Sequence, residues 1–119
     1  MFSKEKAMII VEKIKETRLQ AILISNELQE INYDLSIIKA QIERKLIKKM
    51  GGEKKLAPTE EARERIFVLA RNADEKYVEL YKKSISKKTM LEETKVEIKF
   101  LQDKLNIILA VMKNNDSHD

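Results

Sequence analysis

The chain has 119 residues, of which 43% are hydrophobic, 37% charged and only 5% aromatic, a composition unusual for a globular domain of this length. It contains no tryptophan and no cysteine, which excludes disulfide bonds and cysteine-based metal or redox chemistry and leaves little material for an aromatic core. A net charge of +4 accompanies this mixture. The composition favours long amphipathic helices that bury aliphatic side chains along a narrow seam.

The first part of the chain carries apolar residues at alternating steps of three and four. The series is Ala7, Ile10, Ile14, Ala21, Ile24, Leu28, Ile31, Leu35, Ile38 and Ile42, with Thr17 as its one polar member. A heptad pattern of this kind is typical of a helix that supercoils against another helix. We therefore predict a helix over about residues 4–50.

Both glycines and the only proline of the chain fall within residues 51–58. Gly51 and Gly52 can adopt the positive φ angles that end a helix, and Pro58 cannot continue one. The sequence therefore predicts a single polar turn over about residues 51–58, at which the chain folds back.

A second helix is predicted over about residues 59–113, followed by a polar tail at 114–119. Its seam consists of Ile66, Ala70, Ala73, Tyr77, Leu80, Leu91, Ile98, Leu101, Leu105, Ile108 and Met112, with Ser84, Lys87 and Thr94 at the remaining positions. Asn72 and Asp74 prefer caps and turns, so a break near them is an alternative. We favour a continuous helix because the apolar frame continues through this stretch.

These elements predict an all-α fold in which residues 1–119 form one domain, a long antiparallel two-helix hairpin of the coiled-coil type. If Met50 lies opposite Thr59, Ser84 is expected near Ile24 and Lys87 near Ala21. A polar layer could then set the register there, although we favour a Lys87 side chain that simply reaches outward past a small alanine.

Many apolar residues lie outside the seam, and a lone hairpin would leave them in water. Association of identical chains into a helical-bundle oligomer, at least a dimer, would bury them. The residues assigned to this interface are Ile9, Val11, Ile22, Leu23, Phe100, Ile107 and Val111.

The residue types needed for catalysis are scarce. The only histidine, His118, lies in the polar tail, and the adjacent carboxylates Glu60 with Glu61 and Glu92 with Glu93 are expected on solvated helix faces. We therefore predict no enzymatic activity, no metal and no cofactor. The longest apolar runs, residues 7–11 and 107–112, are too short to cross a bilayer, and the N-terminus lacks the pattern of a signal peptide, so a cytoplasmic protein without a membrane partner is expected.

Positive charge is concentrated around the predicted turn. Residues 39–71 contain ten basic and five acidic side chains, whereas the rest of the chain is nearly balanced. The candidate nucleic-acid-binding residues are Lys45, Lys48, Lys49, Lys54, Lys55, Arg63, Arg65 and Arg71. Such a cluster can neutralise phosphates and release counterions. The alternative is that these side chains stabilise the negative end of the first helix and keep an exposed turn solvated.

The stretch APTEEARERIFVLARNADEKYVELYKK, followed by LEETKVEIKFLQDKLNIILAVMK, resembles small helical coiled-coil proteins of tailed bacteriophages and prophages. In shape and charge the chain is also similar, more loosely, to phage recombination mediators. This second resemblance implies single-stranded DNA binding in recombination or replication, a recombinase or replication protein as partner, and a location in the host cytoplasm. The alternative function is a structural or adaptor coiled coil that binds only protein partners.

Overall fold

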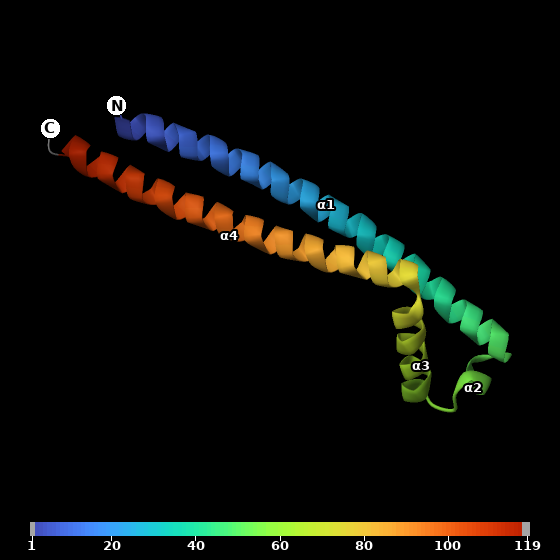
Figure 1. Cartoon of the computed structure of the whole chain (residues 1–119). Helices are drawn as coiled ribbons and strands as arrows, with labels where there is room; N and C mark the ends of the chain where they lie inside the picture. The colour runs from blue at the N-terminus through green and yellow to red at the C-terminus, as the bar shows by residue number, and fades with distance from the viewer. Residues whose placement is uncertain (1, 118–119) are drawn as a thin grey trace. The chain divides into compact units, whose positions relative to one another are not determined.

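The computed structural model describes residues 2–117, and this part of the chain is entirely helical apart from short connections (Figure 1). The helices are α1 (Phe2–Met50), α2 (Glu53–Leu56), α3 (Glu60–Ala73) and α4 (Glu75–Ser117). The predicted all-α fold, with the two long helices α1 and α4 packed antiparallel, is confirmed. His118 lies outside the described residues. The chain divides into two compact units, one made of Met1–Asn26 with Lys87–Asp119 and the other of Glu27–Ser86.

In the first unit, the N-terminal part of α1 runs beside the C-terminal part of α4, and the start of α1 lies at the same end of the pair as the end of α4 (Figure 1). Ile10 and Ile14 of α1 and Leu101 of α4 form its buried core, with Leu105 and Ile108 packed against them. Each fully buried aliphatic side chain contributes roughly 1.5–3 kcal/mol relative to an exposed one. The predicted heptad seam is therefore the surface along which these helix segments pack.

Two threonines occupy buried positions in this same seam. The Thr17 hydroxyl donates a hydrogen bond to the Lys13 carbonyl oxygen at 2.6 Å, and the Thr94 hydroxyl donates to that of Met90 at 2.7 Å. Both bonds stay within one helix, four residues back along the chain. The buried hydroxyls are thus satisfied without a partner from the facing helix, which lets a polar residue occupy the seam.

In the second unit, a polar contact sets the pairing of α1 with the start of α4. Ser84 is only 2% exposed, and its hydroxyl donates a hydrogen bond to the Asn32 Oδ1 atom at 3.0 Å. The predicted register placed Ser84 near Ile24, about two helical turns away along α1, and it is wrong. The buried polar contact at this level of the hairpin joins Ser84 to Asn32.

The connection between α1 and α3 explains this displacement. Gly51 and Gly52 have φ angles of 84° and 131° and end α1 as predicted. Their N–H groups donate to the carbonyl oxygens of Lys48, at 3.3 Å, and Ile47, at 2.9 Å. The short helix α2 and the extended, buried Ala57 then follow, where a simple turn was predicted. The reversal therefore uses more residues than a simple turn would. As a result, residues of α3 and α4 face positions of α1 that lie closer to its C-terminus than predicted.

The start of α3 is capped by Thr59. Thr59 has extended backbone angles, and its hydroxyl oxygen accepts a hydrogen bond from the Ala62 N–H at 3.2 Å. Glu60 and Glu61 occupy the first turn, where negative charge interacts favourably with the helix dipole. The predicted start of the second helical segment is therefore confirmed.

The continuous helix predicted over residues 59–113 is wrong, because α3 ends at Ala73 and α4 begins at Glu75 (Figure 1). Between them Asp74 has φ −86° and ψ 116°, and its Oδ1 atom accepts a hydrogen bond from the Tyr77 N–H at 2.8 Å. The aspartate therefore caps α4, and Ala73, predicted in the seam, is exposed. At its other end α4 continues to Ser117, into the segment predicted as a polar tail.

Replacing Asp74 with alanine is expected to lower the free energy of unfolding by about 1 kcal/mol, because the first turn of α4 loses its side-chain cap. Asp74→Asn should retain most of the stability, since an amide oxygen can accept the same hydrogen bond. Urea unfolding followed by circular dichroism measures both values. A matched Asp34→Ala change on the exposed surface of α1 is the control, and an Asp74→Ala protein as stable as the parent would contradict the capping role.

Candidate nucleic-acid interface and exposed apolar surfaces

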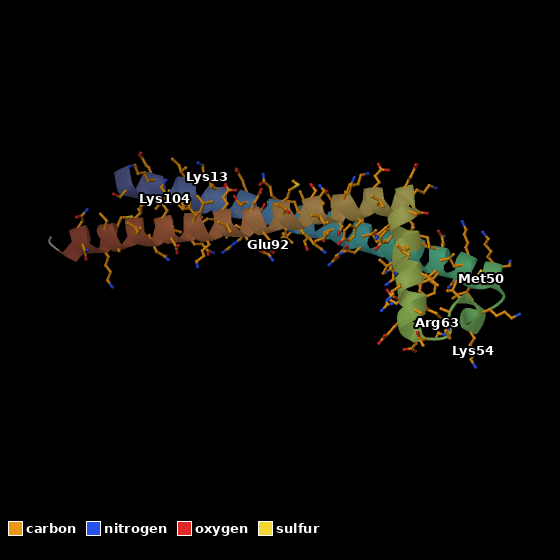
Figure 2. All side chains as sticks on the ribbon, turned by 60° about the horizontal axis from the view of Figure 1, so that its bottom comes forward. Lys13, Met50, Lys54, Arg63, Glu92 and Lys104 are labelled. Carbon is orange, nitrogen blue, oxygen red and sulfur yellow. The ribbon has the colours of Figure 1, made fainter. Side chains whose placement is uncertain are left out.

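All eight predicted nucleic-acid-binding residues belong to the second unit and are carried by three consecutive helices. Six of them are exposed, and we call these six the basic connection: Lys45, Lys48 and Lys49 on α1, Lys54 and Lys55 on α2, and Arg65 on α3. Figure 2 shows the Lys54 side chain projecting from α2, with Arg63 on the neighbouring α3. The connection therefore presents a set of cations to solvent over a short length of chain.

Arg71 is placed differently from the basic connection. Its guanidinium lies 3.2 Å from the Glu43 Oε1 atom on α1 and 3.0 Å from the Glu64 Oε1 atom on α3. The Arg71 side chain is only 11% exposed, compared with 28% for Glu43. Through Glu43, Arg71 links α3 to α1. Its positive charge is already balanced by the two carboxylates.

Arg63 is also engaged within the fold. Its Nη1 atom donates a hydrogen bond to the carbonyl oxygen of Ala57 at 3.1 Å, so it holds the extended residue of the connection against α3. Lys55 folds back toward the end of α1, where its Cδ atom would lie 3.4 Å from a Cβ atom at Gly51. The connection is therefore held by the Arg63 side chain, as well as by the backbone hydrogen bonds of the two glycines.

The lysines of the basic connection also affect the stability of α1. Lys48 and Lys49 occupy the last turn of α1, where they interact favourably with the negative end of the helix dipole. The same exposed ammonium groups can contact phosphate oxygens. Tyr77 and Tyr81 stack on each other, with ring centroids 6.1 Å apart and an interplanar angle of 13°, so their stacked faces are occupied. Neither ring belongs to the basic connection, since both lie on α4.

The seven predicted interface residues are all exposed and all belong to the first unit. They do not form one patch, however. Ile9 and Ile107 line a groove together with Lys13 and Lys104, whose neighbouring positions are visible in Figure 2.

A second groove between α1 and α4 holds other members of the predicted set. Val11 and Ile22 line it together with Lys15 and Arg18, and Leu19 adds a further apolar side chain. The sequence contains a signal for this separation, because residues two positions apart on a helix, such as Ile9 and Val11, point about 200° apart. The remaining members, Leu23 on α1 and Phe100 and Val111 on α4, line neither groove.

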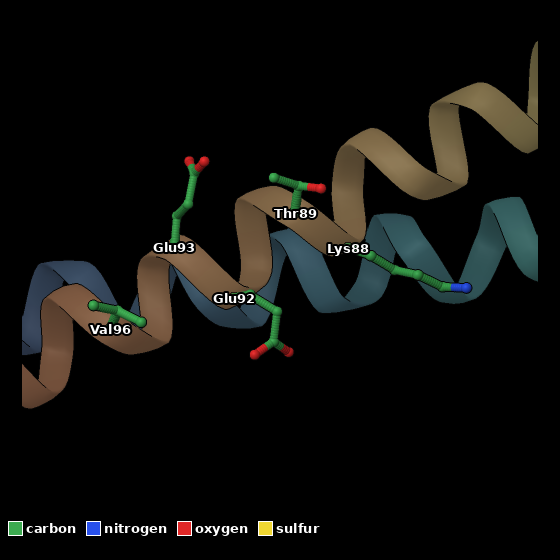
Figure 3. A pocket seen from close by; sticks show the side chains of 5 residues that line it. All are labelled: Lys88, Thr89, Glu92, Glu93 and Val96. Carbon is green, nitrogen blue, oxygen red and sulfur yellow. The ribbon is translucent and has the colours of Figure 1, made fainter.

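The paired carboxylates of α4 do not converge. Lys88, Thr89, Glu92, Glu93 and Val96 line a shallow depression on this helix, and Figure 3 shows the Glu92 and Glu93 side chains pointing to different sides. Glu92 instead lies 3.5 Å from the Lys95 Nζ atom. Within residues 2–117 no group of three or more His, Asp or Glu side chains is arranged to hold a metal ion. Nor does any helix in that range combine the length and apolarity needed to cross a membrane.

No protein-family model, curated protein or solved structure matches this chain.

Proposed function

We propose that the protein is a non-enzymatic accessory factor that binds the backbone of single-stranded DNA through its basic connection. The observation that carries this proposal is the clustering of six exposed cationic side chains on three consecutive helices. The resemblance to phage helical proteins supports a role in recombination or replication, with a recombinase or replication protein as a further partner.

The expected binding mode follows from the chemistry of these side chains. Lysine ammonium groups attract phosphate oxygens without distinguishing bases, and each neutralised phosphate releases counterions from the nucleic acid. Arg63 and Arg71 are expected to contribute less than the six exposed residues, because both already bind groups of the protein itself. Affinity should therefore depend strongly on salt and weakly on base sequence.

Changing Lys48, Lys49, Lys54 and Lys55 together to alanine should weaken binding to labelled single-stranded DNA. The slope of log affinity against log salt should become shallower by up to about 0.7 for each phosphate contact that is lost. Fluorescence anisotropy across a salt series measures this change. Helicity should remain that of the parent, because all four side chains are exposed.

The matched control removes four other exposed lysines of the same unit, Lys39, Lys76, Lys82 and Lys83. This control should keep more of the parent's affinity and salt slope than the variant of the basic connection does. Equal losses in the two variants would mean that binding depends on total charge rather than on this site, and no loss in the connection variant would refute the proposal.

A structural or adaptor protein that binds only other proteins is the second candidate function. The observation that favours it is the set of large apolar side chains exposed on the first unit, several of which line the two grooves there, because exposed apolar grooves are typical of protein interfaces. Failure of the parent protein to bind single-stranded DNA even at low salt would favour this second candidate.

A further inference from the structure

α4 carries a second series of heptad positions besides the seam that packs on α1. We call it the α4 side stripe, and it consists of Met90, Glu93, Glu97, Phe100, Lys104, Ile107 and Val111. All seven residues are exposed and all belong to the first unit. They follow one another at steps of three and four, which places them along one side of the helix. A series with this spacing is suited to packing against another helix.

The order of charged and apolar residues along the α4 side stripe indicates what kind of helix could pack against it. Glu93 and Glu97 precede Phe100, and Lys104 follows it. If a second copy of the stripe lies antiparallel, with Phe100 at the centre, Glu97 of each copy meets Lys104 of the other. Met90 then meets Val111, and the two Phe100 rings meet each other.

A parallel arrangement of the same two stripes is unfavourable. It would place Glu97 against Glu97 and Lys104 against Lys104, and like charges across an interface weaken association. The antiparallel arrangement turns both contacts into attractive pairs. An interface that matches itself under a two-fold rotation is also the commonest basis of a homodimer.

Other charges of the first unit support this choice of surface. Lys13 of α1 lines the same groove as Lys104 and Ile107, so it offers a further cation near the position expected for Glu93 of a second copy. Among the described residues, both grooves are lined by cations and by no acidic residue, but Lys104 and Ile107 of the first groove belong to the α4 side stripe, which also carries Glu93 and Glu97. Two copies meeting through the other groove would bring Lys15 and Arg18 together without acidic side chains of that groove to balance them.

We propose that the α4 side stripe binds the same stripe of a second copy in an antiparallel two-fold dimer, with Phe100 at the axis. Phe100 is 65% exposed and becomes the central apolar contact of the dimer. Glu97 and Lys104 flank it as two symmetry-related ion pairs. This interface is separate from the proposed DNA-binding residues, which belong to the second unit.

A charge exchange tests the pairing by sedimentation equilibrium. Glu97→Lys and Lys104→Glu should each weaken the dimer by at least about tenfold, because each places like charges at both flanking contacts. The double variant Glu97→Lys with Lys104→Glu should recover most of the parent's affinity, since the pairs are restored with their signs exchanged. Helical content, measured by circular dichroism, confirms that the variants are folded.

Glu92→Lys is the matched control, because Glu92 points to a different side of α4 from Glu93 (Figure 3). It makes the same charge change as Glu97→Lys and should leave the dimer intact. If Glu92→Lys weakened the dimer strongly and Glu97→Lys did not, association would involve another surface of the protein. That result would refute the proposed dimer interface.

Cross-linking tests the two-fold axis independently of charge. Since the chain contains no native cysteine, Phe100→Cys introduces a single thiol, which should form a disulfide-linked dimer under mild oxidation. Lys99→Cys, one residue away on α4, should cross-link far less. A monomeric parent at tens of micromolar, no weakening by either charge reversal, or equal cross-linking of the two cysteine variants would each overturn the proposal.

Discussion

Replacing Leu101 with alanine should lower the free energy of unfolding by about 2–5 kcal/mol. Leu101 is 7% exposed and packs against Ile10 and Ile14, the other two members of its buried apolar cluster in the first unit. Few other side chains can move into the space that the leucine leaves, because only two helix segments meet there. Urea unfolding followed by circular dichroism measures the loss.

Leu19→Ala is the matched control for this prediction. Leu19 lies on α1 in the same unit but is 56% exposed, so its truncation removes little buried surface. We expect its effect to stay within about 0.5 kcal/mol, as for ordinary surface substitutions. Equal effects of the two substitutions would mean that the seam between α1 and α4 is not the stabilising core of this unit.

Replacing Arg71 with methionine should destabilise the protein by about 1–3 kcal/mol, because the half-buried Glu43 carboxylate loses a charged hydrogen-bond partner. Methionine retains much of the apolar stem, so the loss reports mainly on the guanidinium group. The contact to Glu64 should contribute less than the contact to Glu43, since the Glu64 side chain is more exposed.

A double-mutant cycle isolates the Arg71 contact. Glu43→Gln removes the carboxylate charge, and Arg71→Met should cost less in that background than in the parent protein. Arg65→Met is the control, because Arg65 lies on the same helix and is exposed. If Arg71→Met and Arg65→Met have the same small effect, the two ion pairs do not stabilise the packing of α3 on α1.

Arg71→Met and the quadruple lysine variant together separate the effects on stability from the effects on the proposed DNA binding. Arg71→Met removes a positive charge close to the basic connection, yet Arg71 is mostly covered by the protein and paired with two carboxylates. Its effect should therefore appear in the free energy of unfolding rather than in affinity for DNA. The four exposed lysines of the quadruple variant should behave in the opposite way.

Local features of the sequence determined where α1 ends, where α3 begins and which side of the long helices is buried. The three-and-four spacing of apolar residues was sufficient to predict the seam around Ile10, Ile14 and Leu101, because residues with that spacing share one side of a helix. Gly51 and Gly52 ended α1 because glycine adopts positive φ angles at little cost. The excess of lysine and arginine around the connection could likewise be counted directly from the sequence.

The sequence around Asp74 favoured two structures, a helix start at Asp74 and a continuous helix, and did not decide between them. The preference of Asp74 for capping was recognisable, but the apolar frame through Ala70, Ala73 and Tyr77 favoured a continuous helix. The pairing of α3 with α1 decided between them, because Arg71 meets Glu43 while Ala73 remains exposed. The hydrogen bond from the Tyr77 N–H to Asp74 then stabilises the new helix start.

The pairing of distant residues was decided only by the tertiary structure. Ser84 meets Asn32, and Arg71 meets Glu43, because α2 and the extended Ala57 lengthen the reversal beyond a simple turn. A heptad repeat cannot specify this register by itself, since a shift by a whole heptad keeps apolar residues facing one another. Which residues face each other therefore depends on the path of the connection and on the polar contacts that close it, whereas the helical state of most of the chain follows from local sequence.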